Sequence, residues 1–166
     1  MIAQNKLVRM TIPAHADFID VVRLSLYGLA TRMGFSFEEI EDMKVAVSEA
    51  CNNVIVHAYA GMEEGFIDVA FETAPDSLRI AIKDYGESFD YQTVSEKADS
   101  LHDKEIADIK AGGLGIYMMQ ALMDEVEVSN DHGTEVVLTK WLGRSLGGNT
   151  HAAESNVSVI SRDSRE

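Results

Sequence analysis

Three polar residues recur at four-residue intervals in the first half of the chain. Glu49, Asn53 and His57 have the spacing i, i+4 and i+8, which places a carboxylate, an amide and an imidazole on one face of an α-helix. Such a row is either an ordinary solvated helix face or one wall of a binding site. The spacing alone leaves both interpretations open.

A carboxylate ends a strand-like segment further along the chain. Asp84 shares the alternation phase of Ile80 and Ile82, so its side chain should point toward the buried side of a sheet. An unpaired buried carboxylate is costly, which means that Asp84 needs a hydrogen-bond donor. Gly86 follows two residues later and has no side chain to keep a flat ligand from the backbone. The alternative is a strand-end turn capped by Asp84.

A glycine-rich segment precedes a short apolar run. It reads Gly112-Gly113-Leu114-Gly115 and leads directly into Ile116. Free backbone amides and the positive end of a helix are the groups that bind a polyphosphate. The segment lacks the preceding strand of a dinucleotide-binding fold and the Gly-Lys-Ser/Thr ending of a Walker loop. It is therefore either a phosphate-binding loop of another kind or a plain glycine-rich helix start.

Two helices and several strands must position these groups. Ser36 and Glu39 have the spacing of a capping box, and the apolar residues after them recur at steps of three and four, which predicts a helix over about residues 37–58. A similar stripe predicts an amphipathic helix over residues 15–33. The remaining elements are strands expected at 6–12, 66–72, 78–84, 125–130 and 134–142, and a short helix at 116–123.

This order of elements, with hairpin-length links between strands, predicts an antiparallel or mixed sheet covered on one face by helices, the α+β class. The segment from Gly86 to Lys110 is charged and poor in large apolar residues, and we interpret it as a mobile cover. Residues 1–142 are expected to form one domain. Residues 143–166, rich in Gly, Ser and Asn and with three basic and three acidic residues, are expected to be a disordered tail.

Composition restricts the possible partners. The 166 residues carry a formal net charge of −14, the wrong sign for direct binding to nucleic acid. Because the chain shows neither a signal peptide nor an apolar run long enough to span a membrane, we expect a cytoplasmic protein that does not enter membranes.

Four motifs in one order make a more specific pattern than any of them alone. They are Glu49-x-x-x-Asn53, Asp84-x-Gly86, Gly113-x-Gly115 and Gly133-Thr134. Over about residues 5–142 this pattern resembles the GHKL (Bergerat-fold) ATPase superfamily, whose fold is a two-layer sandwich of helices on a mixed, mostly antiparallel sheet. The segments Ser48–His57 and Gly113–Ile116 are similar to those of the anti-sigma-factor serine kinases within it.

The resemblance implies roles for individual residues. Asn53 would ligate Mg²⁺, since an amide oxygen suits a hard cation, and Asp84 would accept a hydrogen bond from the adenine amine of ATP. Glu49 would be the general base for the attacking serine hydroxyl. The segment Gly112–Ile116, with Gly86, would complete the nucleotide site.

The resemblance also assigns His57 and Thr134 to the nucleotide site. Lys110 is a candidate phosphate contact, and the alternative is that it is an ordinary surface lysine. One departure is Ser88, where many relatives have a second glycine, and it implies an altered loop.

The resemblance also implies a function. The chain would be an anti-sigma factor and an ATP-dependent serine kinase that sequesters a sigma factor of the sigma-B type, phosphorylates its anti-anti-sigma factor, represses stress-response transcription and forms a homodimer. The alternatives are a stand-alone ATP-binding or ATPase switch without protein kinase activity, and a sequestering protein whose ATP site is vestigial. The pairing of Glu49 with Asn53 argues against the latter, because a pure binding module needs no base beside a metal ligand.

Overall fold

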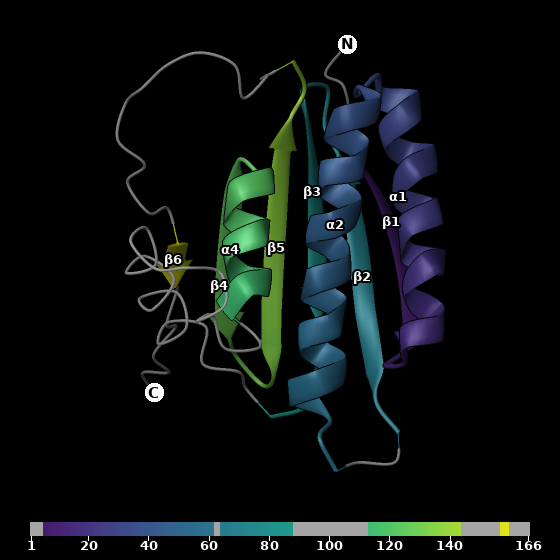
Figure 1. The fold of residues 1–166 in the computed structure, drawn as a ribbon. Helices are drawn as coiled ribbons and strands as arrows, with labels where there is room; N and C mark the ends of the chain where they lie inside the picture. The colour runs from purple at the N-terminus through teal and green to yellow at the C-terminus, as the bar shows by residue number, and fades with distance from the viewer. Residues whose placement is uncertain (1–4, 62–63, 88–112, 144–156, 160–166) are drawn as a thin grey trace, which may run out of the picture.

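The computed structural model describes residues 5–61, 64–87, 113–143 and 157–159. One layer of helices lies against one face of a single sheet (Figure 1). The predicted α+β class is therefore confirmed, as is the two-layer arrangement with a mixed, mostly antiparallel sheet covered on one face.

In the part of the chain that the structure describes, the sheet has six strands in the order β1-β2-β3-β5-β4-β6. Every neighbouring pair is antiparallel except β4 and β6, which run parallel. Alternate residues of the central strands, such as Ile67, Val69 and Phe71 in β2, are fully buried against the helices, as expected for a half-covered sheet. In sheet order the strands are Lys6–Pro13 (β1), Phe66–Thr73 (β2), Ser77–Lys83 (β3), Thr134–Trp141 (β5), Glu125–Asn130 (β4) and Val157–Val159 (β6).

The helical layer follows the predicted pattern with local differences. Its elements are η1 (Ala16–Phe18), α1 (Ile19–Met33), α2 (Phe37–Asn53), η2 (Val54–Ala58) and α4 (Gly113–Leu122). The predicted capping box is present, because the Ser36 hydroxyl accepts from the Glu39 amide and the Glu39 carboxylate accepts from the Ser36 amide. Gly34 ends α1 with a positive φ of 92°, a conformation that glycine adopts without strain.

The core lies between the two layers and is built almost wholly from aliphatic side chains. Cys51, on α2, is fully buried in it, and burial raises the pKa of its thiol to about 12. This agrees with the interpretation of Cys51 as a packing residue.

Two helix boundaries differ from the prediction. The helix expected to continue to residue 58 changes to π-helix after Asn53, a wider winding that hydrophobic periodicity does not reveal. The short helix begins at Gly113, so the glycine motif forms its first turn instead of a loop before it.

Two other predictions fall mainly outside the described residues. Of the cover expected between Gly86 and Lys110, the structure describes Gly86 and Glu87. Of the tail expected at 143–166 it describes Gly143 and β6, which lies parallel to β4. The disorder of the rest of that tail stays a prediction. None of the helices in the described ranges has both the length and the apolar character needed to cross a bilayer.

Candidate functional site

The first turn of α4 lies directly against the polar row on α2. A β-carbon placed on Gly115 would be 2.8 Å from Glu49 Oε2 and 3.7 Å from Asn53 Oδ1. The structure thus brings together two motifs separated by more than 60 residues of sequence. A side chain at position 115 would crowd the Glu49 carboxylate, which explains why this turn of the helix carries glycine.

Backbone donors are concentrated at this end of α4. The first four N–H groups of an α-helix have no acceptor within the helix, and in α4 they belong to Gly113, Leu114, Gly115 and Ile116. Leu114 is 42% exposed, whereas the Ile116 side chain is buried in the core. Ile116 therefore anchors the turn through its side chain, and its amide belongs to the donor set.

The donors and oxygens at this site suit a metal–phosphate complex. Asn53 is buried and Glu49 is half-buried, while the positive end of α4 faces them. Within the described ranges no group of three His, Cys, Asp or Glu residues is placed to hold a metal alone. Mg²⁺ is commonly bound through one or two protein oxygens together with substrate phosphates.

Asp84 lies in a second part of the candidate site, separate from the first turn of α4. It follows β3, is 2% exposed, and its Oδ1 accepts from the amides of Gly86 at 3.1 Å and Thr134 at 3.2 Å. Burial raises the pKa of the Asp84 carboxyl, and the two amide hydrogen bonds oppose that shift. Among the described residues both hydrogen bonds reach Oδ1, which leaves Oδ2 as an acceptor for a ligand donor.

The hydrogen bond from Gly86 is the turn-cap geometry that the alternative interpretation of Asp84 anticipated. The cap and a ligand contact are compatible, because they use different oxygens. Thr134, the first residue of β5, is buried and makes two hydrogen bonds with Asp84. Its amide donates to the Asp84 carboxylate, and its carbonyl accepts from the Asp84 amide at 2.9 Å.

Two glycines hold the Asp84 segment in place. A β-carbon on Gly86 would overlap the carbonyl oxygen of Ala58, and one on Gly133, whose φ is +100°, would overlap the carbonyl of Asp84. The Ala58 carbonyl also accepts from the Glu87 amide at 2.9 Å. The missing side chain of Gly86 therefore admits the end of η2, and its contact with a ligand stays a prediction.

Of the other predicted site residues, the structure describes some and not others. His57 lies in the π-helical η2, so it does not continue the α-helical spacing of Glu49 and Asn53, and it is half-buried. Lys110 and Gly112 lie outside the described residues.

Sequence reasoning missed two tyrosines, Tyr59 and Tyr85, that contact the Asp84 segment. The Tyr59 hydroxyl accepts from the Tyr85 amide at 3.0 Å. Their only signal in the sequence is the position of Tyr85 between Asp84 and Gly86.

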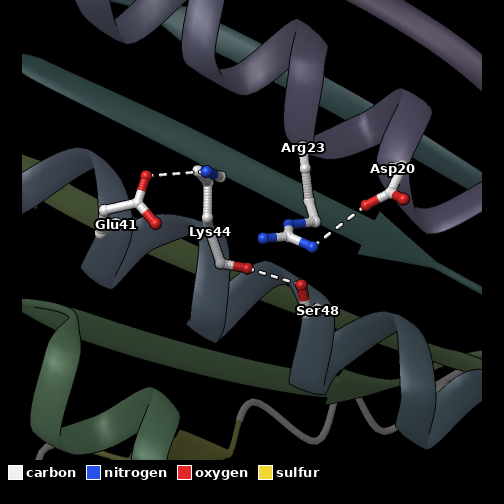
Figure 2. A network of polar contacts seen from close by, with 5 residues as sticks. All are labelled: Asp20, Arg23, Glu41, Lys44 and Ser48. Carbon is white, nitrogen blue, oxygen red and sulfur yellow. Dashed lines mark hydrogen bonds and ion pairs between the residues drawn. The ribbon is translucent and has the colours of Figure 1, made fainter.

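Figure 2 shows polar contacts within α1 and within α2 where the two helices lie side by side, on α2 as far as Ser48, the residue before Glu49. Arg23 reaches from α1 toward α2 and contacts Asp20 at 3.0 Å. On α2, Lys44 pairs with Glu41 at 2.7 Å, and the Lys44 carbonyl accepts from the Ser48 hydroxyl at 2.7 Å. Arg23 Nε is buried without a partner among the described residues. Partly exposed ion pairs such as these add little stability.

Comparisons with known proteins identify the family of the chain. The family of histidine kinase-like ATPase domains matches residues 12–140. The serine-protein kinase RsbW of Bacillus pumilus is 45% identical over 141 residues, covering 83% of this chain and 87% of that protein. The RsbW of Bacillus subtilis is 40% identical over 136 residues, covering 81% and 85%.

A solved structure shows the same fold. The crystal structure of the RsbU and RsbW domains of a Mycobacterium tuberculosis protein aligns with a TM-score of 0.58 at 23% identity, covering 81% of this chain and 32% of that one. From the sequence matches, the chain belongs to the histidine kinase-like ATPase domain family and, within it, to the serine-protein kinases RsbW.

Proposed function

We propose that this chain is an ATP-dependent protein serine kinase that also acts as an anti-sigma factor in the cytoplasm. It sequesters a sigma factor of the sigma-B type and phosphorylates the anti-anti-sigma factor on serine. The approach of Gly115 to Glu49 and Asn53 supports the proposal, because a carboxylate, an amide oxygen and backbone N–H groups are the groups that a base, a metal ligand and a phosphate site require. The names of the relatives supply the reaction class.

ATP lies between Asp84 and the first turn of α4. Asp84 Oδ2 accepts from the adenine amine, and the amides of the first α4 turn bind the phosphates. Asn53 Oδ1 is the protein ligand of Mg²⁺, which neutralises charge on the phosphates. His57, Thr134, Gly112 and Lys110 are further candidate contacts to the nucleotide.

Glu49 accepts the proton of the substrate serine hydroxyl. Its Oε2 faces the turn that holds the phosphates, so a hydroxyl directed at the terminal phosphate meets the carboxylate. Its partial exposure leaves it open to a protein substrate. The contact with Gly115 fixes where the carboxylate stands, and a base contributes through position as well as basicity.

Protein partners use the surface formed by α1 and β1. On α1 the side chains of Val21, Leu24 and Tyr27 are exposed, Leu24 at 70%. Among the described strands, β1 forms one edge of the sheet and pairs with β2 alone, and a sheet edge is able to accept another strand. This surface serves a homodimer contact, the sigma factor and the anti-anti-sigma substrate, and it makes the last two mutually exclusive.

Phosphorylation then releases the substrate. A phosphoserine adds about −1.5 to −2 charges at neutral pH, and the chain already has a net charge of −14. Repulsion weakens the product complex and frees the kinase for the sigma factor. Titrating substrate into a preformed sigma complex tests this: unphosphorylated substrate should displace sigma and the phosphorylated form should not. Equal displacement by both, or a stable ternary complex, would contradict the switch.

The decisive test of the activity is phosphotransfer to a protein. The chain is incubated with γ-labelled ATP and candidate anti-anti-sigma factors, with the Glu49→Ala variant as control, and phosphoserine on the partner is measured by mass spectrometry. The proposal requires label on a partner serine that the variant does not transfer. Hydrolysis of ATP with no labelled partner would instead identify a nucleotide-driven switch module.

A further inference from the structure

We propose that Tyr59 and Tyr85 are positioning residues that hold the Asp84 carboxylate in the geometry required for adenine. The inference rests on the proposed function, because it assumes that Asp84 receives the adenine amine. Neither tyrosine needs to touch the nucleotide. Both act on the three-residue segment Asp84-Tyr85-Gly86, which leaves the end of β3.

Tyr59 supports this segment from the helical side. Its hydroxyl accepts from the Tyr85 amide at 3.0 Å and donates to the carbonyl of Phe66 at 2.7 Å. The ring lies where a β-carbon on Gly65 would stand, so the phenol is packed over the start of β2. One hydroxyl thus ties the residue after Asp84 to the neighbouring strand.

Tyr85 supports the segment through its own side chain. Its ring is 62% exposed, so burial alone does not hold it. Its hydroxyl donates to Asp68 Oδ2 at 2.8 Å, and Lys83 Nζ lies 5.7 Å from its ring centroid. The hydrogen bond to Asp68 and its negative charge raise the pKa of Tyr85, which keeps the phenol protonated as the donor.

Asp68 is itself fixed by the sheet. It pairs in register with Thr11 of β1 and Lys83 of β3, and its Oδ1 accepts from the Thr11 hydroxyl. The two oxygens of this carboxylate therefore join the edge strand to the segment that carries Asp84. Consecutive residues at the end of β3 are therefore held differently. Asp84 is buried toward the helices, whereas the exposed side chain of Tyr85 is held by Asp68 of β2.

This arrangement predicts a selective defect. If the tyrosines only stabilised the fold, their loss would lower the melting temperature and affect every ligand alike. If they position Asp84, their loss weakens ligands that contain adenine and spares ligands that contain only phosphates. The phosphate-binding turn of α4 has its own support against Glu49 and Asn53.

The test compares ATP with tripolyphosphate in calorimetric titrations. The variants are Tyr85→Phe and Tyr59→Phe, with Ser77→Ala as the control, because it removes a hydroxyl from the end of β3 that is remote from Asp84. Tyr85→Phe loses one hydrogen bond and should weaken ATP binding by about 3- to 10-fold. Tyr59→Phe loses two and should weaken it at least as much. Tripolyphosphate affinity, phosphotransfer at saturating ATP and the control should stay at the wild-type level.

A double variant checks that Tyr85 acts through Asp68. Tyr85→Phe combined with Asp68→Asn should bind ATP no more weakly than the weaker of the two single variants. Equal ATP affinity for wild type and Tyr85→Phe would overturn the inference and leave the proposed function intact, as would parallel losses for ATP and tripolyphosphate. A wild-type chain that binds no ATP would instead overturn the proposed function, and this inference with it.

Discussion

Replacing Asp84 with asparagine tests adenine recognition with the smallest change of shape. The asparagine oxygen is able to take over the two hydrogen bonds now accepted by Oδ1, from the amides of Gly86 and Thr134. Its NH₂ group then stands at the position of Oδ2. There it presents a donor to the adenine amine, which is also a donor.

The expected loss follows from the kind of bond removed. A hydrogen bond to a charged group contributes about 1.5–3 kcal/mol, which corresponds to about 10- to 150-fold weaker binding of ATP. A nucleotide whose base has a carbonyl in place of the amine, such as ITP, should lose less or gain. The ratio of ATP to ITP affinity should therefore fall even if both affinities change.

Stability should move in the other direction. Burial raises the pKa of Asp84, so the folded chain binds this proton more tightly than the unfolded chain does. The contribution of Asp84 to stability is then highest below its ordinary pKa and declines as the pH rises through the raised value. Asparagine has no charge to desolvate. Asp84→Asn should be at least as stable as wild type at neutral pH, with a flatter pH profile across that window.

Calorimetric titration with ATP and ITP, together with thermal melting at several pH values, measures both effects. Asp76→Asn provides a matched control, because it makes the same change at an exposed position in the turn before β3. Unchanged affinity of Asp84→Asn for ATP would show that Asp84 is a turn cap and nothing more. A lower melting temperature, together with an equal loss of affinity for ATP and ITP, would show that the substitution had disrupted the structure of the segment.

Three further predictions concern the base, the glycine turn and the C-terminal tail. Glu49→Ala should still bind ATP in calorimetry but transfer phosphate about 10² to 10⁴-fold more slowly, and a rate within a few-fold of wild type would exclude Glu49 as the base. Gly115→Ala should keep the melting temperature, since alanine favours helix, yet slow transfer by roughly 10²-fold because its β-carbon displaces the carboxylate; unchanged turnover would mean that the carboxylate position is not critical. Deleting residues 147–166 should lower the melting temperature by no more than about 2–4 °C and leave phosphotransfer intact, because β6 has only three residues; a larger drop would show that the tail supports β4.

Local sequence signals account for most of the individual elements. The capping box at Ser36 and Glu39 is satisfied within four consecutive residues, so it acts regardless of the rest of the fold. Strand alternation placed Asp84 on the buried side correctly, because period two follows from backbone geometry alone. The motif order was also sufficient to indicate the family, since each motif is a short run of residues.

Contacts between distant segments were decided only by the tertiary structure. The sheet places β5 between β3 and β4, and no local pattern encodes which strands pair. The change to π-helix after Asn53 arises where Ala58 must meet Gly86, a contact between residues 28 positions apart in the chain. Sequence spacing therefore extended an α-helix through His57 where the fold required a wider turn.

The site itself divides in the same way. Residue types and spacing indicated Glu49, Asn53 and Asp84, because their chemistry is carried by side chains that can be read one at a time. The contact of Gly115 with Glu49, and the hold of Tyr59 and Tyr85 on the Asp84 segment, exist only after the layers have packed. The exact position of a side chain depends on how all its neighbours pack. Many residues determine that packing together, so it cannot be inferred from one residue at a time.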